Sequence, residues 1–294
     1  MSGLGAALQV LVSGATVGSV YALVALGLVL LYRTTRILNF AHGDIGVLGT
    51  FLAYVLLTQL DLPFGVSFAL ALAAAALIGA LLYLVVVRPA KTETDLGLII
   101  LTLGLALALG GFDALVFGTD NKVVPTLVPD RVVRVAGAGL SVASLVTASL
   151  GVVLMLALWA LLSYTRLGIA MRALAQRPDV AEALGLPVRT VLLATWGAAA
   201  VLATAAALLF APTTLLNPSM MLDPLSKGFV AAVIGGMNSL PGAVLGGYVL
   251  GVLELVVGVY VSLEFKASFA FLVVILVLLL RPHGLLGRPD VKRV

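Results

Sequence analysis

Long apolar runs, broken by short polar segments, dominate the chain. The stretches without Asp, Glu, Lys or Arg are 1–32, 45–60, 62–87, 96–112, 135–165, 190–222, 228–253 and 267–280. The hydrocarbon core of a bilayer is about 30 Å thick and takes roughly 17–25 residues per helical span. Backbone polar groups within that core must pair inside the segment, so these stretches predict membrane-spanning helices.

The pattern predicts about nine spans, with one doubtful segment. They lie near 8–32, 44–60, 64–87, 96–112, 140–163, 190–211, 225–237, 242–262 and 267–282. The segment 225–237 is short for a span, and seven spans remain if 225–262 is re-entrant. The expected fold class is all-α, a polytopic membrane helical bundle, with 1–294 as a single transmembrane domain.

Basic residues between the spans indicate the orientation. Alternate connecting segments (33–44, 88–95, 164–190 and 281–294) hold 12 Lys and Arg, against 5 on the opposite side. The positive-inside rule places the richer side in the cytoplasm. We therefore expect an odd number of spans, with the N-terminus outside and the C-terminus in the cytoplasm. The segment 113–139 is then an external loop, and 164–190 is cytoplasmic. Within the external loop, the extended pieces Val123-Val124 and 131–135, on either side of Pro129-Asp130, predict a small hairpin.

Composition excludes several classes of protein. Hydrophobic residues make up 62% of the 294 residues and charged residues 10%, whereas about 25% of a soluble chain is charged. The chain has no Cys and only two His, which excludes thiolate metal sites and a histidine-rich metal cluster. The net charge of +4 comes mostly from residues between apolar runs, so it indicates topology rather than nucleic-acid binding.

Enzyme motifs are missing from the sequence. A P-loop requires Gly before its Lys, because the glycine-rich backbone surrounds the phosphates. The residues that precede the Lys residues are Ala90, Asn121, Ser226, Phe265 and Val291. The sequence also has no His-Glu-x-x-His and no Gly-x-Ser-x-Gly. We expect no ATPase site, no catalytic residues and no cofactor in this chain.

Small residues mark faces where helices pack. Gly14 and Gly18 lie in the first predicted span, and Gly246 and Gly251 lie in the eighth. Small side chains let helix backbones approach within van der Waals contact, which drives association in lipid. We expect these faces to contact protein rather than lipid.

A few polar residues are candidates for a transport path. Glu254 lies within an apolar span, where an ionisable group either lines a hydrophilic path or hydrogen-bonds a neighbouring helix. Asn39, His42 and Asp44 lie where the chain re-enters the membrane, and Asn39 or Asp44 is expected to cap the second span. Their alternative role is to line a gate or path.

The predicted cytoplasmic loop 164–190 contains a delimited helix. Pro178 fits a first helical position, Asp179 follows in the first turn, and Gly185 fits the C-terminal cap. Val180, Ala183 and Leu184 then share one face. Such a helix either docks on a cytoplasmic partner or lies on the membrane surface.

These residues resemble a known family. The motifs are Tyr21-Ala-Leu-Val-Ala-Leu-Gly-Leu, Thr35-Arg-Ile-Leu-Asn-Phe-Ala-His-Gly-Asp, Arg166-Leu-Gly-Ile-Ala-Met-Arg-Ala, Ile234-Gly-Gly-Met-Asn-Ser-Leu-Pro-Gly-Ala and Arg281-Pro-His-Gly-Leu-Leu-Gly-Arg. In this order they are similar to the permease subunit of branched-chain amino acid ABC importers, of the Liv H type. The match extends over nearly the whole chain, although Asn238 stands where the family usually has Gly.

The resemblance implies a passive, ATP-gated conduit in a bacterial inner membrane. Its expected partners are a second, similar permease, two ATP-binding subunits and an external, periplasmic substrate-binding protein. The loop 164–190 then resembles a coupling segment. We assign coupling to a helix over 171–186, with Arg172, Pro178, Asp179, Ala181, Glu182 and Gly185. We assign the substrate path to Asn39, His42, Asn238, Ser239 and Glu254.

One alternative function stays open at this point. A secondary carrier driven by protons would use Glu254 as its titrating group. A relay of this kind usually contains several acids or histidines in series, whereas Glu254 is a single acid in its span.

Overall fold

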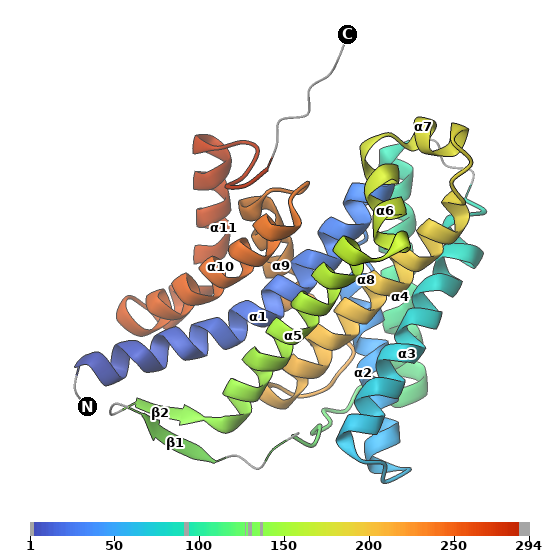
Figure 1. Cartoon of the computed structure of the whole chain (residues 1–294). Helices are drawn as coiled ribbons and strands as arrows, with labels where there is room; N and C mark the ends of the chain where they lie inside the picture. Colours follow the sequence, from blue (N-terminus) through green and yellow to red (C-terminus); the bar gives the residue numbers. More distant parts are fainter. Residues whose placement is uncertain (1–2, 91–93, 127, 129–130, 136–137, 288–294) are drawn as a thin grey trace. The chain divides into compact units, whose positions relative to one another are not determined.

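The computed structural model describes residues 3–90, 94–126, 128, 131–135 and 138–287 (Figure 1). Contacts within the chain divide it into two compact units. The first unit contains 1–29, 126–151 and 223–294, and the second contains 30–125 and 152–222. Helices α1 and α5 each contribute residues to both units.

The first unit is built mainly from four helices and one hairpin. Its elements are the N-terminal part of α1 (Gly3–Thr35), β1 (Val132–Val135), β2 (Ala138–Ser141), the start of α5 (Val142–Tyr164), α9 (Leu222–Gly235), α10 (Leu240–Tyr260) and α11 (Leu263–Leu280). The strands pair antiparallel, with Val132 opposite Ser141 and Val135 opposite Ala138. The predicted hairpin is therefore wrong in its pairing: the extended piece 131–135 does form a strand, but its partner is β2 and not Val123-Val124.

Glycines bring α1 and α10 of the first unit into close contact. A methyl group added to Gly251 would lie 2.5 Å from the Cα of Gly18, and one added to Gly14 would lie 2.8 Å from the Cα of Val252. These distances leave no room for a side chain. The structure confirms the predicted packing role of Gly14, Gly18 and Gly251.

The second unit contains the other long helices. Its elements are α2 (His42–Thr58), α3 (Phe64–Leu82), the π-helical turn η1 (Tyr83–Val87), α4 (Asp95–Phe117), α6 (Arg166–Gln176), α7 (Pro178–Ala183), α8 (Val188–Phe210) and the 3₁₀ turn η2 (Ala211–Thr213). Helix α8 packs against both α2 and α3. A methyl group on Gly46 or Gly79 would collide with the backbone of α8, at the carbonyls of Ala203 and Trp196 respectively.

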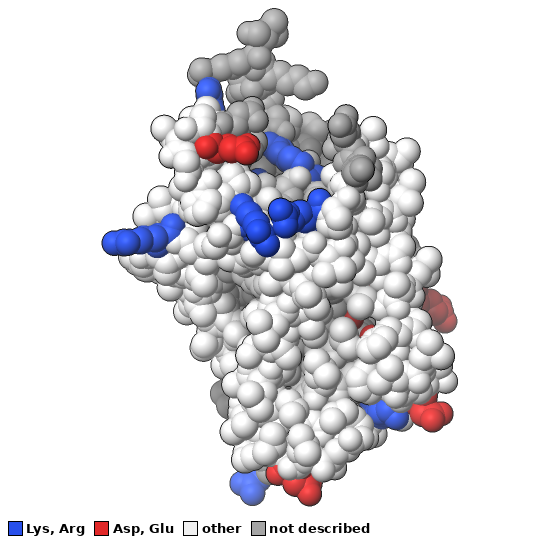
Figure 2. Space-filling view, turned by 90° about the vertical axis from the view of Figure 1, so that its right-hand side faces the viewer, with Lys and Arg blue, Asp and Glu red and all other residues white. Residues whose placement is uncertain are grey.

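Among the residues that the structure describes, six helical segments are long and apolar enough to cross a membrane. They are 5–35, 64–87, 96–117, 142–164, 188–213 and 240–260, and α2 and residues 268–280 are shorter apolar helices. Large apolar side chains remain exposed on them: Leu107 and Leu115 of α4 are 80% and 89% exposed. On the face shown in Figure 2, residues other than Lys, Arg, Asp and Glu predominate. This surface is typical of a multi-pass membrane protein.

Two local predictions are wrong. The helix expected over 171–186 is interrupted at Arg177, which has φ −150° and ψ 89°, and α7 begins at Pro178. Proline disfavours helical geometry in the residue before it, which explains the break. The second span has Ala41 as its N-cap, without a side-chain cap from Asn39 or Asp44, because α2 already begins at His42. Asp44 instead lies in the first turn, where the helix dipole favours an acid.

Candidate functional site

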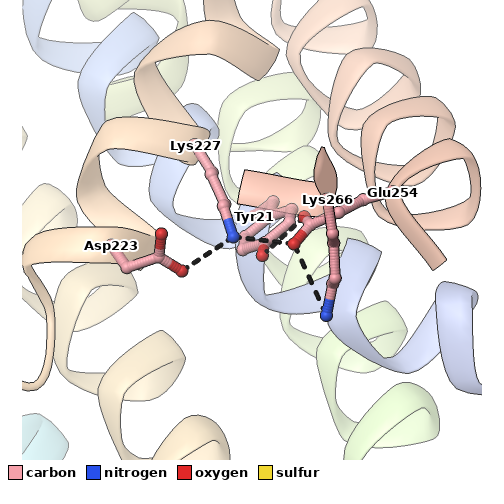
Figure 3. Close-up of polar contacts among 5 residues, drawn as sticks. All are labelled: Tyr21, Asp223, Lys227, Glu254 and Lys266. Atoms are coloured by element: carbon pink, nitrogen blue, oxygen red, sulfur yellow. Dashed lines mark hydrogen bonds and ion pairs between the residues drawn. The ribbon is translucent and has the colours of Figure 1, made fainter. Parts of the chain in front are cut away.

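A network of polar side chains connects four helices of the first unit (Figure 3). Lys227 Nζ of α9 lies 2.7 Å from Glu254 Oε1 of α10 and 2.9 Å from Asp223 Oδ2, one turn earlier on α9. The hydroxyl of Tyr21 on α1 donates to Glu254 Oε2 at 2.9 Å. Lys266 Nζ of α11 lies 3.6 Å from Glu254 Oε1. Glu254 is therefore the centre of the network.

The two carboxylates and two ammonium groups of the network differ in how far their side chains are exposed to solvent. The side chain of Glu254 is 1% exposed and that of Lys227 is 8% exposed. The Lys266 and Asp223 side chains are 32% and 62% exposed. Glu254 and Lys227 lose hydration on burial, and the opposite charge within hydrogen-bonding distance offsets that cost. An isolated buried charge would have no such compensation.

Local sequence features explain how these side chains meet. The glycine contacts between α1 and α10 bring Tyr21 within reach of Glu254, and a methyl group on Gly228 would collide with the side chain of Val24, so α9 also approaches α1 closely. Ser262 caps α11 by accepting from the backbone N–H of Glu264 and of Phe265. Lys266 therefore lies in the first turn of α11, and its stem passes Gly258 of α10.

Sequence reasoning found Glu254 but missed its partners. The structure supports the alternative in which Glu254 contacts neighbouring helices, because α1, α9 and α11 each supply one of its partners. The sequence analysis used Lys227 and Lys266 only as two of the five basic residues on the side opposite the cytoplasm, and did not anticipate that Lys227, at 6% exposed, is buried against Glu254. A usable signal existed: Lys227 is the last charge before an uncharged run that ends at Glu254.

In the second unit, two other predicted path residues are buried where the chain enters α2: Asn39 lies before the helix, and His42 is its first residue. The Oδ1 of Asn39 accepts from the backbone N–H of Ala41 at 3.1 Å. His42 is fully buried, and among the described residues neither its ring nitrogens nor Asn39 Nδ2 has a hydrogen-bond partner. Thr102 of α4 donates to the carbonyl of Leu38 at 3.1 Å, which holds the segment between α1 and α2 against α4.

The turn between α9 and α10 contains the remaining predicted path residues. Ser239 is the N-cap of α10, and its hydroxyl accepts from the N–H of Gly242 at 3.1 Å. Gly236 has φ +106°, and a methyl group there would lie 2.6 Å from the Cα of Gly287. Asn238 Oδ1 would lie 3.3 Å from a methyl group on Gly287. This turn therefore packs against the segment that follows α11.

Backbone hydrogen bonds join the same turn to the C-terminal motif. The N–H of Leu285 donates to the carbonyl of Ile234 at 2.8 Å, and the N–H of Leu286 donates to that of Gly235 at 3.0 Å. The end of α9 and the segment after α11 are thus fixed together. Ser239 and Asn238 have structural roles here that the sequence did not reveal.

The segment 164–190 forms two short helices, of which α6 packs against α8 and α7 packs against α6. Thr165 caps α6 by accepting from the N–H of Gly168 at 3.0 Å, and Met171 and Leu174 of α6 are buried. Gly185 follows α7 with φ +77°, as expected for a C-terminal cap. The position predicted for Pro178, the first residue of a helix, is confirmed.

Several side chains of this segment are exposed. Val180 and Leu184 are 43% and 78% exposed, while Ala181 is 3% exposed and packs inward. Arg172 and Glu182 are exposed. Of the predicted coupling residues with a described side chain, Arg172 and Glu182 are therefore accessible to a partner, and the buried Ala181 is not. The side chains of Pro178 and Asp179 lie outside the described residues.

Comparison with known proteins identifies the family. The family model described as "Branched-chain amino acid transport system / permease component" matches residues 10–279, which include nearly every helix described above. The chain belongs to this family. The resemblance inferred from the sequence motifs is confirmed, and the permease contains the Glu254 network, the α1–α2 segment and the α6–α7 segment within the matched region.

Relatives match the permease over almost its full length. It is 32% identical over 303 residues to the high-affinity branched-chain amino acid transport system permease protein LivH of Salmonella typhimurium, covering 98% of this chain and 97% of the relative. It is 33% identical over 300 residues to BraD of Pseudomonas aeruginosa, covering 98% of each chain. A probable LivH of Methanocaldococcus jannaschii is 28% identical, covering 90% of this chain and 88% of the relative. No solved structure matches the permease significantly.

Proposed function

We propose that the permease is a membrane subunit of an ATP-binding-cassette importer that moves branched-chain amino acids into the cytoplasm. The full-length similarity to high-affinity branched-chain amino acid permeases carries this proposal. The apolar helices support a role within a bilayer. Separate subunits supply ATP hydrolysis, because the sequence has no P-loop.

The assembly that we propose contains four further subunits besides the permease. A second, homologous permease completes the membrane part, two ATP-binding subunits dock on the cytoplasmic side, and an external, periplasmic protein delivers the substrate. The exposed apolar side chains Val180 and Leu184 beside Glu182 suit docking of α7 on an ATP-binding subunit. Because α6 is buried against α8 through Met171 and Leu174, movement at α7 is transmitted to a long helix.

We propose nine membrane crossings in a bacterial inner membrane, by α1–α5 and α8–α11, with the N-terminus outside. The distribution of basic residues supports this orientation. The hydrogen bonds from Leu285 and Leu286 to the end of α9 support α9, α10 and α11 as three consecutive crossings, because they join the ends of α9 and α11 on one side. At 14 residues, α9 is the shortest of them. We retain Asn39, His42 and Glu254 as path residues.

Replacement of Glu182 by Arg tests the docking of α7. In proteoliposomes that contain all subunits, Glu182→Arg is expected to abolish uptake of leucine and stimulation of ATPase activity, because it reverses an exposed charge on the docking helix α7. Membrane insertion stays intact, since Glu182 is exposed. Gly185→Arg, at φ +77°, is expected to have the same effect.

A matched control uses Asp120, an exposed acid that follows α4. Asp120→Arg is expected to co-purify with the ATP-binding subunits as the unmodified permease does. If Glu182→Arg and Gly185→Arg also co-purify and transport normally, the docking assignment is wrong.

The alternative function is a proton-driven carrier that uses Glu254. The contacts of Glu254 with Lys227, Lys266 and Tyr21 disfavour it, because both carboxylate oxygens already have partners within the chain. The purified permease alone, in vesicles with a pH gradient, is expected to take up no leucine. Uptake under these conditions would replace the ABC proposal by the carrier.

A further inference from the structure

The Glu254 network is buried at its centre, and two of its members with opposite charge, Lys266 and Asp223, are partly exposed to solvent. Glu254 and Lys227 have side chains that are 1% and 8% exposed, whereas those of Lys266 and Asp223 are 32% and 62% exposed. Figure 3 shows Asp223 on one side of Lys227, and Lys266 approaching Glu254 from another. An ammonium group and a carboxylate are therefore both accessible next to a buried ion pair.

Lys266 is the loosely held member of the network. Its Nζ lies 3.6 Å from Glu254 Oε1, beyond hydrogen-bonding distance, while Lys227 Nζ lies at 2.7 Å from the same atom. Its stem crosses Gly258, where an added methyl group would lie 3.1 Å from Lys266 Cδ. The place near Glu254 Oε1 that Lys266 fills can thus accept another ammonium group without loss of a hydrogen bond.

The charge balance of the network favours a particular class of ligand. A ligand with a single charge would leave one member of the balanced set without a partner, and an unpaired buried charge is strongly unfavourable. A zwitterionic α-amino acid brings one ammonium and one carboxylate group together. It can pair with Glu254 and Lys266 while the net charge of the site stays unchanged.

A purely structural role explains these residues less well. A buried ion pair seldom stabilises a fold more than apolar side chains of the same volume would. Ionisable groups within apolar segments are functional candidates by default, and here four of them converge from α9, α10 and α11. The contacts of Tyr21 and Lys227 also fix the Glu254 carboxylate in position, as a binding site requires.

We propose that Glu254 and Lys266 bind the ammonium and carboxylate groups of the amino acid as it crosses this subunit. The ammonium group binds at Glu254 Oε1, the carboxylate binds Lys266, and Lys227 and Tyr21 position Glu254. This inference rests on the proposed function and deepens it, because it names the groups of the substrate that the permease itself recognises.

Binding of radiolabelled leucine tests this assignment directly. The complete membrane complex, in nanodiscs without the external binding protein, is expected to bind leucine saturably. Leucinamide lacks the carboxylate and 4-methylpentanoate lacks the ammonium group, so each is expected to compete at least about thirtyfold more weakly than leucine, as loss of one buried charge partner implies. Equal competition, or no saturable binding of leucine, would overturn the proposal.

Variants of Lys266 separate recognition from structure. Lys266→Gln is expected to weaken leucine binding by a similar factor, about thirtyfold, whereas Lys266→Arg keeps the charge and binds leucine. Glu264→Gln is the matched control, because Glu264 is an exposed acid in the same helical turn and is expected to bind as the unmodified protein does. Unchanged binding by Lys266→Gln would contradict the proposal.

Transport by a double variant distinguishes this proposal from the proposed function. Lys227→Met with Glu254→Met replaces the buried pair by apolar side chains of similar volume, and is expected to assemble but to lose leucine uptake by about tenfold or more. If the unmodified complex imports leucine and the double variant does so equally well, this proposal alone is wrong. If the unmodified complex imports no branched-chain amino acid, the proposed function falls and this proposal with it. If the double variant does not assemble, the Lys266 variants decide.

Discussion

Buried polar groups are satisfied differently in the two units of the permease. In the first unit, Glu254 is 1% exposed, and both of its oxygens have partners from other helices. In the second unit, Asp113 of α4 is fully buried, and neither of its oxygens has a hydrogen-bond partner among the described residues. A methyl group on Gly110, one turn earlier, would lie 3.6 Å from the carboxylate of Asp44. Asp113 thus has another acid nearby instead of a base.

The difference shows what decides the effect of a buried acid. The first unit supplies two lysines and a phenol, so the charge of Glu254 is compensated locally. The described part of the second unit supplies no such partner to Asp113. A buried carboxylate without a partner is strongly unfavourable. We therefore expect removal of one charged partner to be costly at Glu254, and removal of the carboxylate itself to be favourable at Asp113.

Breaking the paired site is expected to have the largest effect. Lys227→Met leaves Glu254 buried with the Tyr21 hydroxyl and, as its nearest cation, the more distant ammonium of Lys266, so the free energy of unfolding should fall by about 3–5 kcal/mol. Lys227→Met with Glu254→Met should recover most of this loss. Thermal unfolding of the detergent-solubilised protein measures both. A double variant as unstable as the single one would show that the pairing is not what stabilises this site.

Separating α1 from α10 is expected to have the next largest effect. Gly251→Ala adds a methyl group 2.5 Å from the Cα of Gly18, so the helices must move apart and Tyr21 must withdraw from Glu254. The free energy of unfolding should fall by about 3 kcal/mol, at the upper end of the range for overpacked sites. Gly104→Ala on α4 is the control, because nothing lies within 4 Å of its added methyl group. Equal stability of the two variants would refute the close-packing argument.

Removal of the unpaired acid is expected to have a smaller effect of opposite sign. Asp113→Leu replaces a buried polar group that has no partner among the described residues, so the free energy of unfolding should rise by about 1 kcal/mol. Glu254→Leu should instead lower it, because it leaves Lys227 without its buried partner. The same unfolding assay compares them. Destabilisation by Asp113→Leu would show that Asp113 has a partner outside the described chain.

Much of the helical structure follows from local sequence. The predicted spans 64–87 and 140–163 agree closely with α3–η1 and α5, because apolar runs of that length must pair their own backbone in lipid. Pro178 and Gly185 delimit α7 as their geometry requires. The break at Arg177 was also available from sequence, since the residue before proline avoids helical geometry.

The candidate site was only partly available from the sequence. Glu254 was found because an acid inside an apolar run is conspicuous. Its pairing with Lys227 was missed because the two residues are 27 positions apart and lie on different helices. The sequence did not show that Ser239 is the N-cap of α10, or that Asp44 lies inside the first turn of α2. Both depend on the residue at which each helix begins.

The amino-acid sequence by itself determined that this is a helical membrane protein, and it indicated the family, because apolar runs and short motifs are local properties of the chain. Only the tertiary structure decided which polar groups are paired. Tyr21 and Glu254 are 233 positions apart, and they meet because Gly18 and Gly251 let α1 and α10 touch. Whether a buried charge is compensated depends on such distant contacts, and a pattern read along the chain does not contain them.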